Sequence, residues 1–238
     1  NFSVKKGEIL GFVGLVGAGR SEIMRALCGV EKRLSGDVYV KGKKVNIKNP
    51  SDAMKYGISF LTEDRRTDGL ALQLPIKTNI NMNSYEMISK GGVISLKEEN
   101  NRAEDYSKRV NVKTPSVMQL VGNLSGGNQQ KVVIAKLLCC DPDVLIFDEP
   151  ASALDPSAEM EQFSAIQEKI QGRTAILISH RVGFARWADR IFVMDQGKLA
   201  EVGTHEELME KQGIYLEFFQ SQAEWYDVKK EDAAYETE

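Results

Sequence analysis

A glycine-rich segment near the start of the chain constrains the fold more than any other feature. Residues 14–21 read Gly-Leu-Val-Gly-Ala-Gly-Arg-Ser. They follow a short apolar run at residues 8–13 and precede a helical pattern in which Ile23, Met24 and Leu27 share one face. This order predicts a strand, a loop and a helix in immediate succession.

The spacing of this segment matches the phosphate-binding P-loop at every fixed position except one, where Arg20 replaces lysine. In such a loop, backbone N–H groups and the positive end of the following helix face the same phosphate group. We therefore expect nucleotide binding here, with the Ser21 hydroxyl holding Mg²⁺. The simpler alternative is that the glycines only form a tight turn. The residues expected to bind the nucleotide are Gly14, Gly17, Ala18, Gly19, Arg20, Ser21 and Glu22.

The arginine at position 20 is expected to slow catalysis. A guanidinium keeps the positive charge of lysine, but it is a planar fork on a longer stem and cannot settle between two phosphates as a compact ammonium does. We therefore expect retained nucleotide binding with impaired or slow hydrolysis.

A second group of candidate residues follows two later apolar runs. Residues 144–147 are apolar and lead directly into Asp148 and Glu149, and residues 174–178 lead into Ser179 and His180. The carboxyl ends of parallel strands form the ligand-binding edge of open α/β sheets. We expect Asp148 to coordinate Mg²⁺, Glu149 to polarise the attacking water and His180 to hold that water. A solvated acidic turn and a surface histidine are the alternatives.

The remaining pattern predicts an α/β fold: a P-loop core with a mostly parallel sheet and flanking helices, an antiparallel β segment and an inserted α-helical subdomain. We expect a hairpin at residues 37–47, a buried strand at 57–61, a strand pair at 191–194 and 198–202, and a helix from Glu206 to about Tyr226. The expected division is a catalytic core at 1–63 and 137–215, a helical subdomain at 64–136, and a C-terminal helix and charged tail at 216–238.

Composition excludes several classes of protein. A formal net charge of -3 over 238 residues gives no sign of a nucleic-acid binder, so no nucleic-acid partner is expected. Three cysteines without metal-ligand spacing are typical of reduced thiols in a cytosolic protein. No apolar run is long enough to span a bilayer. Because the chain starts at Asn1, without a methionine, we expect it to be a piece of a longer product.

The segment Leu124-Ser125-Gly126-Gly127-Asn128-Gln129-Gln130 closely resembles the signature motif of ABC (ATP-binding cassette) ATPases. This resemblance implies ATP and Mg²⁺ as ligands. It also implies that Ser125, Gly126 and Gly127, at the start of a helix over 129–138, complete the γ-phosphate site of an opposite cassette, so that two cassettes form a dimer. Residues 152–155 resemble the family's D-loop. Glu63 stands where the family usually has a glutamine that touches Mg²⁺ and water.

The resemblance differs between the two halves of the chain. Residues 7–150 resemble the second cassette of the tandem ATPases of ribose, galactose and xylose importers, a subfamily in which the arginine is usual. Residues 151–226 resemble exporter-type cassettes instead, through the Ile178-Ser179-His180-Arg181 segment among others. We interpret the chain as a chimera joined at residues 148–150; a single lineage that drifted is the alternative. The family's adenine-stacking aromatic residue would lie upstream of this chain.

The resemblance implies an ATPase that drives transport at the cytoplasmic face of a bacterial membrane, with a second cassette and transmembrane permease subunits or domains as partners. Monosaccharide import is the first expectation, from the N-terminal half, and an exporter cassette is the alternative. A third hypothesis is a nucleotide-binding cassette with little or no hydrolysis. Cassettes of DNA repair or translation are the last hypothesis. Such cassettes usually carry long coiled-coil or basic insertions, and none is visible in this sequence.

Overall fold

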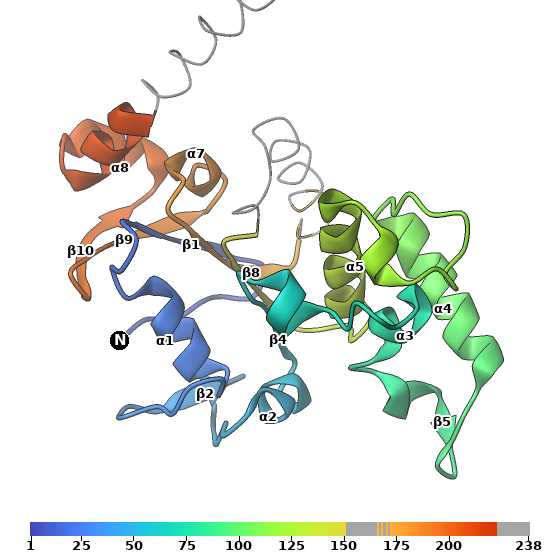
Figure 1. The fold of residues 1–238 in the computed structure, drawn as a ribbon. Coiled ribbons are helices and arrows are strands. Elements are labelled where there is room, and N and C mark those ends of the chain that lie inside the picture. The colour runs from blue at the N-terminus through green and yellow to red at the C-terminus, as the bar shows by residue number, and fades with distance from the viewer. Residues whose placement is uncertain (151–165, 167, 169, 171, 223–238) are drawn as a thin grey trace, which may run out of the picture.

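The computed structural model describes residues 1–150, 166, 168, 170 and 172–222. A β-sheet lies at its centre (Figure 1). Within these residues the sheet has six strands in the order β10-β9-β1-β8-β7-β4. Their bounds are β1 (Ile9–Gly14), β4 (Ile58–Leu61), β7 (Val144–Asp148), β8 (Thr174–Ser179), β9 (Arg190–Asp195) and β10 (Lys198–Gly203).

Five of these strands run parallel, and β10 pairs antiparallel with β9 at the edge. Strand β8 lies between β1 and β7, with Val13 opposite Ser179 and Asp148 opposite Ile178. Because parallel strands end at the same edge, the ends of β1, β7 and β8 lie side by side. The predicted parallel sheet is confirmed, and its topology brings the candidate residues to one edge.

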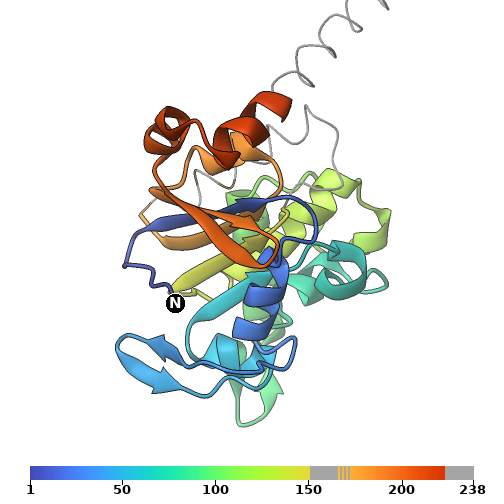
Figure 2. The ribbon, with the colours of Figure 1, turned by 90° about the vertical axis from the view of Figure 1, so that its left-hand side faces the viewer.

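Side chains on each strand alternate between the two faces of the sheet, as the period of two requires. On one face, Ile146, Ile176 and Phe12 pack against α1 (Arg20–Leu27) and against the antiparallel hairpin of β2 (Val38–Val40) and β3 (Lys43–Val45). Helix α2 (Pro50–Lys55) adds Ala53 to the same cluster, and Figure 2 shows α1 and the hairpin on this side. The predicted hairpin at 37–47 is confirmed.

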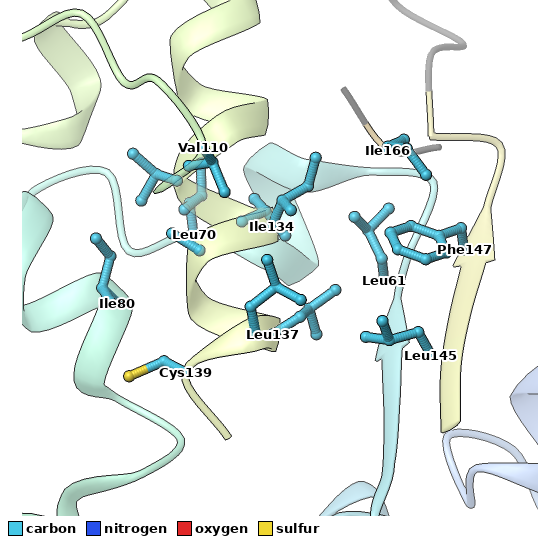
Figure 3. Packing of buried hydrophobic residues seen from close by; sticks show 14 of the residues in the cluster. Leu61, Leu70, Ile80, Val110, Ile134, Leu137, Cys139, Leu145, Phe147 and Ile166 are labelled. Carbon is cyan, nitrogen blue, oxygen red and sulfur yellow. The ribbon is translucent and has the colours of Figure 1, made fainter. Parts of the chain in front are cut away.

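The opposite face of the sheet packs against α5 (Gly126–Leu138). Leu145 and Phe147 of β7 lie beside Leu61 of β4, and Ile134 and Leu137 of α5 face them (Figure 3). The same cluster includes Leu70, Ile80 and Val110, so one apolar core joins the sheet to the segment at 64–136. This core fixes α5 against the strand that ends in Asp148.

The segment at 64–136 is mainly helical, as predicted. Its helices α3 (Ile76–Asn81), α4 (Leu96–Arg109) and α5 pack on one another. It also contains a π-helix at Arg65–Gly69, 3-10 turns at Tyr85–Ile88 and Val121–Asn123, and a short hairpin of β5 (Ser89–Lys90) and β6 (Val93–Ile94). Helix α5 runs across position 136, where the sequence-based division places a boundary; that division stays a prediction.

Two helix predictions need correction. Helix α5 begins at Gly126, with Ser125 as its N-cap, and not at Gln129. The helix expected from Glu206 onward is broken into α8 (His205–Lys211) and a second helix at 214–222. Gln212 ends α8 in the left-handed conformation at φ 53°. Only glycine fits at position 213, between the two helices, because a side chain there would collide with the Glu201 carboxylate.

The last helical segments cover the β9 and β10 end of the sheet. Helix α7 (Val182–Ala185) follows β8, and its residues pack with α8 in a third apolar cluster. Figure 1 shows α7 and α8 together on one side of the molecule. In the described part of the chain, no helix combines the length and apolar character that crossing a bilayer would need.

Candidate nucleotide-binding site

The glycine-rich segment forms a loop between β1 and α1, as predicted. A side chain at Gly14 would overlap the carbonyl oxygen of Met194, so only glycine fits where the loop leaves the strand. Gly17 and Gly19 have φ values of 83° and 86°, in the left-handed region that favours glycine. Gly19 is the N-cap of α1 and offers no side-chain cap, so the first-turn N–H groups are available to an anion.

Ser21 in the first turn of α1 is joined to the acidic end of β7. Its Oγ donates a 2.7 Å hydrogen bond to Oδ1 of Asp148. Asp148 is 2% exposed, and burial raises its pKa to about 6; the nearby charge of Glu149 acts in the same direction, and the Ser21 hydroxyl opposes both. Two side chains separated by 127 positions in sequence therefore present oxygen atoms at one point.

Glu149, the second acid, is held on several sides. Its backbone lies in the left-handed region at φ 45°, an uncommon conformation for a residue with a side chain, and its N–H donates to the Ile178 carbonyl at 3.0 Å. Its carboxylate accepts the backbone N–H of His180 at 2.7 Å and the Ser179 hydroxyl at 3.3 Å. These bonds fix the direction of a carboxylate that is only 7% exposed.

His180 contacts the same carboxylate with its ring. Its Nδ1 lies 2.9 Å from Oε1 of Glu149, and the side chain is about one third exposed. The hydrogen bond to Glu149 raises the pKa of His180 above its ordinary value, against the opposing effect of burial. The structure thus places the strand-ending histidine in direct contact with this acid, while the water-holding role expected for His180 stays a prediction.

Arg20 extends from the loop toward the acids. Its side chain is 6% exposed and its Nη1 lies 3.3 Å from Oε1 of Glu149. This contact is an ion pair without hydrogen-bond geometry, because Nη1 has no hydrogen-bond partner within the described part of the chain. Burial lowers the pKa of Arg20, and the charges of Glu149 and Asp148 oppose that shift. The loop cation and the two acids thus form one buried electrostatic unit.

The other predicted site residues lie outside this contact network or at its margin. Glu63 follows β4 and is exposed, yet its charge adds to the rise of the Asp148 pKa. Glu22 is exposed in the first turn of α1. Ser125 is exposed at the start of α5, next to the half-buried Gly126 and Gly127, and its Oγ accepts a 3.0 Å hydrogen bond from Asn128. The predicted D-loop at 152–155 lies outside the described residues.

Two residues that stabilise the site were not singled out by sequence reasoning. Ser179 bonds Glu149 and also accepts the Arg181 N–H at 3.0 Å. Gln130 of α5 is buried and donates to the Pro150 carbonyl at 2.9 Å, so the helix that starts at Ser125 is tied to the segment after Glu149. A serine directly before the candidate histidine was the only signal available for the first of these.

The residues present fit a Mg-nucleotide. Mg²⁺ in nucleotide sites is held by one or two protein oxygens together with phosphate oxygens and water. The adjacent Ser21 hydroxyl and Asp148 carboxylate supply two such oxygens, beside the uncapped start of α1. Elsewhere in the described residues, no group of three or more His, Cys, Asp or Glu side chains offers an alternative metal site.

A glycine loop between a parallel strand and a helix, with acids at the end of another parallel strand of the same sheet, defines a P-loop nucleotide-binding domain. The family model described as ABC transporter matches residues 1–152. The chain therefore belongs to the ABC transporter family, as an ATP-binding cassette, and this membership confirms the resemblance found in the signature segment.

Curated relatives are sugar-import ATPases. The xylose import ATP-binding protein XylG of Thermoanaerobacter pseudethanolicus is 43% identical over 202 residues, which is 84% of this chain and 40% of that protein. The ribose import ATP-binding protein RbsA of Lactococcus lactis subsp. cremoris is 46% identical over 202 residues, 84% of this chain and 41% of that protein. The chain thus spans about two fifths of the length of these relatives.

Solved structures support the same fold. A bacterial Atm1-family ABC exporter with ATP bound is 28% identical, with a TM-score of 0.75 over 93% of this chain and 38% of the exporter chain. A dimeric cassette bound to ADP and Pi is 22% identical, with a TM-score of 0.72 over 86% of this chain and 88% of that cassette. The importer alignments are longer than residues 1–150, so that similarity extends past the expected junction. The chimera stays a prediction beside the single-lineage alternative.

Proposed function

We propose that this chain binds Mg-ATP at the loop of residues 14–21 and hydrolyses it as the motor domain of an ABC importer. The observation that carries this proposal is the meeting of two pairs at one sheet edge: Ser21 with Asp148 at 2.7 Å, and Glu149 with His180 at 2.9 Å. The first pair offers oxygens to a metal ion. The second pair offers a base and a group that holds it.

Each residue has a separate role in this proposal. The backbone N–H groups at the start of α1 and the Arg20 side chain bind phosphate oxygens. Glu149 orients the attacking water and accepts its proton, and His180 keeps the carboxylate in place by its two hydrogen bonds. Mg²⁺ bound at Ser21 and Asp148 would supply neutralisation of phosphate charge, the main requirement of phosphoryl transfer.

The site is proposed to be completed by a second cassette. Ser125, Gly126 and Gly127 begin α5, with Ser125 exposed and its Oγ not capping the helix. An uncapped helix start is suited to an anion that arrives from outside the chain. We assign these residues to the γ-phosphate of the partner's nucleotide, in a homodimer or heterodimer that works with transmembrane permease subunits at the cytoplasmic face of a bacterial membrane.

Monosaccharide import is the proposed transport reaction. It is supported by the xylose and ribose import proteins that are 43% and 46% identical to the chain. The exporter-type alternative is supported by the 28% identical Atm1-family exporter. Co-purification with candidate membrane subunits tests the choice: retention by a sugar permease, and not by an exporter membrane domain, is the expected result.

A binding module with little hydrolysis is the second candidate function. The ion pair between Arg20 and Glu149 favours it, because a carboxylate in contact with a buried guanidinium is less available to a water molecule. The exposed Glu63, in place of the usual glutamine, points the same way.

Phosphate release from ATP by the purified chain, with and without Mg²⁺, tests hydrolysis directly. Glu149→Gln should reduce Mg-dependent turnover by about 10²-fold or more, because the water loses its base. Glu104→Gln, on the exposed surface of α4, is the matched control and should leave turnover unchanged. Equal rates for the chain and Glu149→Gln would instead establish the second candidate.

A further inference from the structure

The helix at residues 214–222 is fixed to the sheet at its start. The Glu201 carboxylate of β10 accepts the backbone N–H groups of Ile214 at 2.9 Å and Tyr215 at 3.1 Å, so it caps this helix. The Tyr215 side chain is fully buried, and its hydroxyl lies 2.8 Å from Nδ1 of His205. The first turn of this helix therefore has a defined position and direction.

An apolar cluster extends from this helix to the nucleotide site. Tyr215 belongs to the same buried cluster as Val182 and Ala185 of α7 and Val13 of β1, the residue before the loop glycine Gly14. Both ribbon views place α7 beside the C-terminal segment (Figures 1 and 2). Because packed cores transmit strain, a shift of this helix would displace side chains of α7 and β1.

Gln222, in the last described turn of this helix, makes two hydrogen bonds to the backbone of the turn after His180. Its Oε1 accepts the Val182 N–H at 2.8 Å, and its Nε2 donates to the His180 carbonyl at 2.6 Å. One side-chain amide thus satisfies a donor and an acceptor on either side of Arg181. A carboxylate only accepts and an alkyl side chain does neither, so neither of them replaces the amide.

The same histidine is bonded on its other side by Glu149, the proposed catalytic base. The His180 N–H donates to Glu149 Oε1 at 2.7 Å, and the ring Nδ1 lies 2.9 Å from the same oxygen. A backbone shift at His180 would therefore change both contacts to Glu149. Catalytic geometry tolerates little displacement, since about 1 Å can cost 10²-fold in rate.

We propose that Gln222 is a positioning residue, through which the helix at 214–222 sets the alignment of His180 on Glu149. Its catalytic consequence rests on the proposed function; the structural coupling does not. A displacement of the helix at 214–222 away from α7 would then release the turn after His180 and lower the rate of hydrolysis.

Three variants test this assignment. Gln222→Leu keeps the volume and removes both hydrogen bonds. Gln222→Glu keeps an acceptor for the Val182 N–H but loses the donor to the His180 carbonyl. Ser221→Ala, on the exposed side of the same turn, is the matched control, because among the described residues the Ser221 hydroxyl bonds only the Phe218 carbonyl in its own helix.

The first readout is steady-state ATP hydrolysis. Both Gln222 variants should lower kcat by about tenfold or more while KM changes little, because the base is misplaced and the phosphate loop is untouched. Ser221→Ala should match the parent chain. If the parent chain hydrolyses ATP and both Gln222 variants have the same kcat as the parent, the proposal is overturned.

The second readout needs no turnover. The chain has two histidines, so ¹H–¹⁵N spectra of the imidazole rings contain two sets of signals, and His180→Gln identifies the one of interest. Both Gln222 variants should move the His180 ring signals, Gln222→Leu in the direction produced by Glu149→Gln, with the His205 signals in place as a check on folding. His180 signals unchanged in both variants would overturn the proposal, even if the parent chain proves inactive.

Discussion

The guanidinium Nη1 of Arg20 lies 3.3 Å from Oε1 of Glu149, which also bonds the ring of His180. A cation from the phosphate loop and the proposed catalytic base are thus in direct contact inside the protein. A bound phosphate would compete with Glu149 for the Arg20 guanidinium. Phosphate binding and the contact of Glu149 with Arg20 are therefore linked.

Arg20→Lys is expected to raise ATP affinity or turnover by about fivefold, equivalent to roughly 1 kcal/mol. The shorter, compact ammonium can reach between phosphates and releases the Glu149 carboxylate from a planar fork. Isothermal titration with Mg-ATP and phosphate-release kinetics measure the two effects. Arg25→Lys, whose side chain pairs with Glu31 on the outer face of α1, is the control. If neither affinity nor turnover rises, our account of position 20 is wrong.

Ser21→Ala should weaken Mg-ATP binding by about tenfold while leaving Mg-free nucleotide binding nearly unchanged. The substitution removes one of the two oxygens offered to the metal and also the hydroxyl that bonds Asp148 at 2.7 Å. Nucleotide titrations with Mg²⁺ and with excess chelator separate the two cases. An equal loss under both conditions would show that Ser21 acts on the phosphates or on the loop fold.

Asp148→Asn should stabilise the nucleotide-free chain at pH 7.5 by about 1 to 3 kcal/mol. The pKa of Asp148 is about 6 in the folded chain, against 3.8 ordinarily, so the folded chain binds a proton between pH 6 and pH 4 that the unfolded chain does not. Its charged form therefore lowers stability above pH 6, and that penalty fades toward pH 4. Urea unfolding at pH 4.5 and 7.5 should show the advantage only at the higher pH.

His180 should titrate above its ordinary pKa of 6.5, and Glu149→Gln should bring that pKa down. The Glu149 carboxylate favours the protonated ring, so this contact adds stability that is complete below pH 6.5 and is lost as pH rises through the folded pKa. An NMR titration of the ring protons measures both chains. A pKa that is the same with glutamate and with glutamine would contradict the role we give to this contact.

Much of the site could be predicted because it depends on local pattern. The glycines at 14, 17 and 19 need backbone conformations or space that other residues lack, and such demands are visible in sequence. The apolar run before Asp148 predicts a buried strand that ends in an acid, and the structure has that strand. The break at Gln212 could not be predicted, because it depends on the Glu201 carboxylate reaching across from β10.

By itself the sequence determined the order of strand, loop and helix, the position of the acids at a strand end, and the family. The tertiary structure alone decided which side chains meet: Ser21 with Asp148, Arg20 with Glu149, and Gln222 with the turn after His180. The physical reason is the strand order. Parallel pairing of β1 with β8 and of β8 with β7 brings the end of β1 close to strand ends more than 100 positions further along the chain, and no local spacing encodes that neighbourhood.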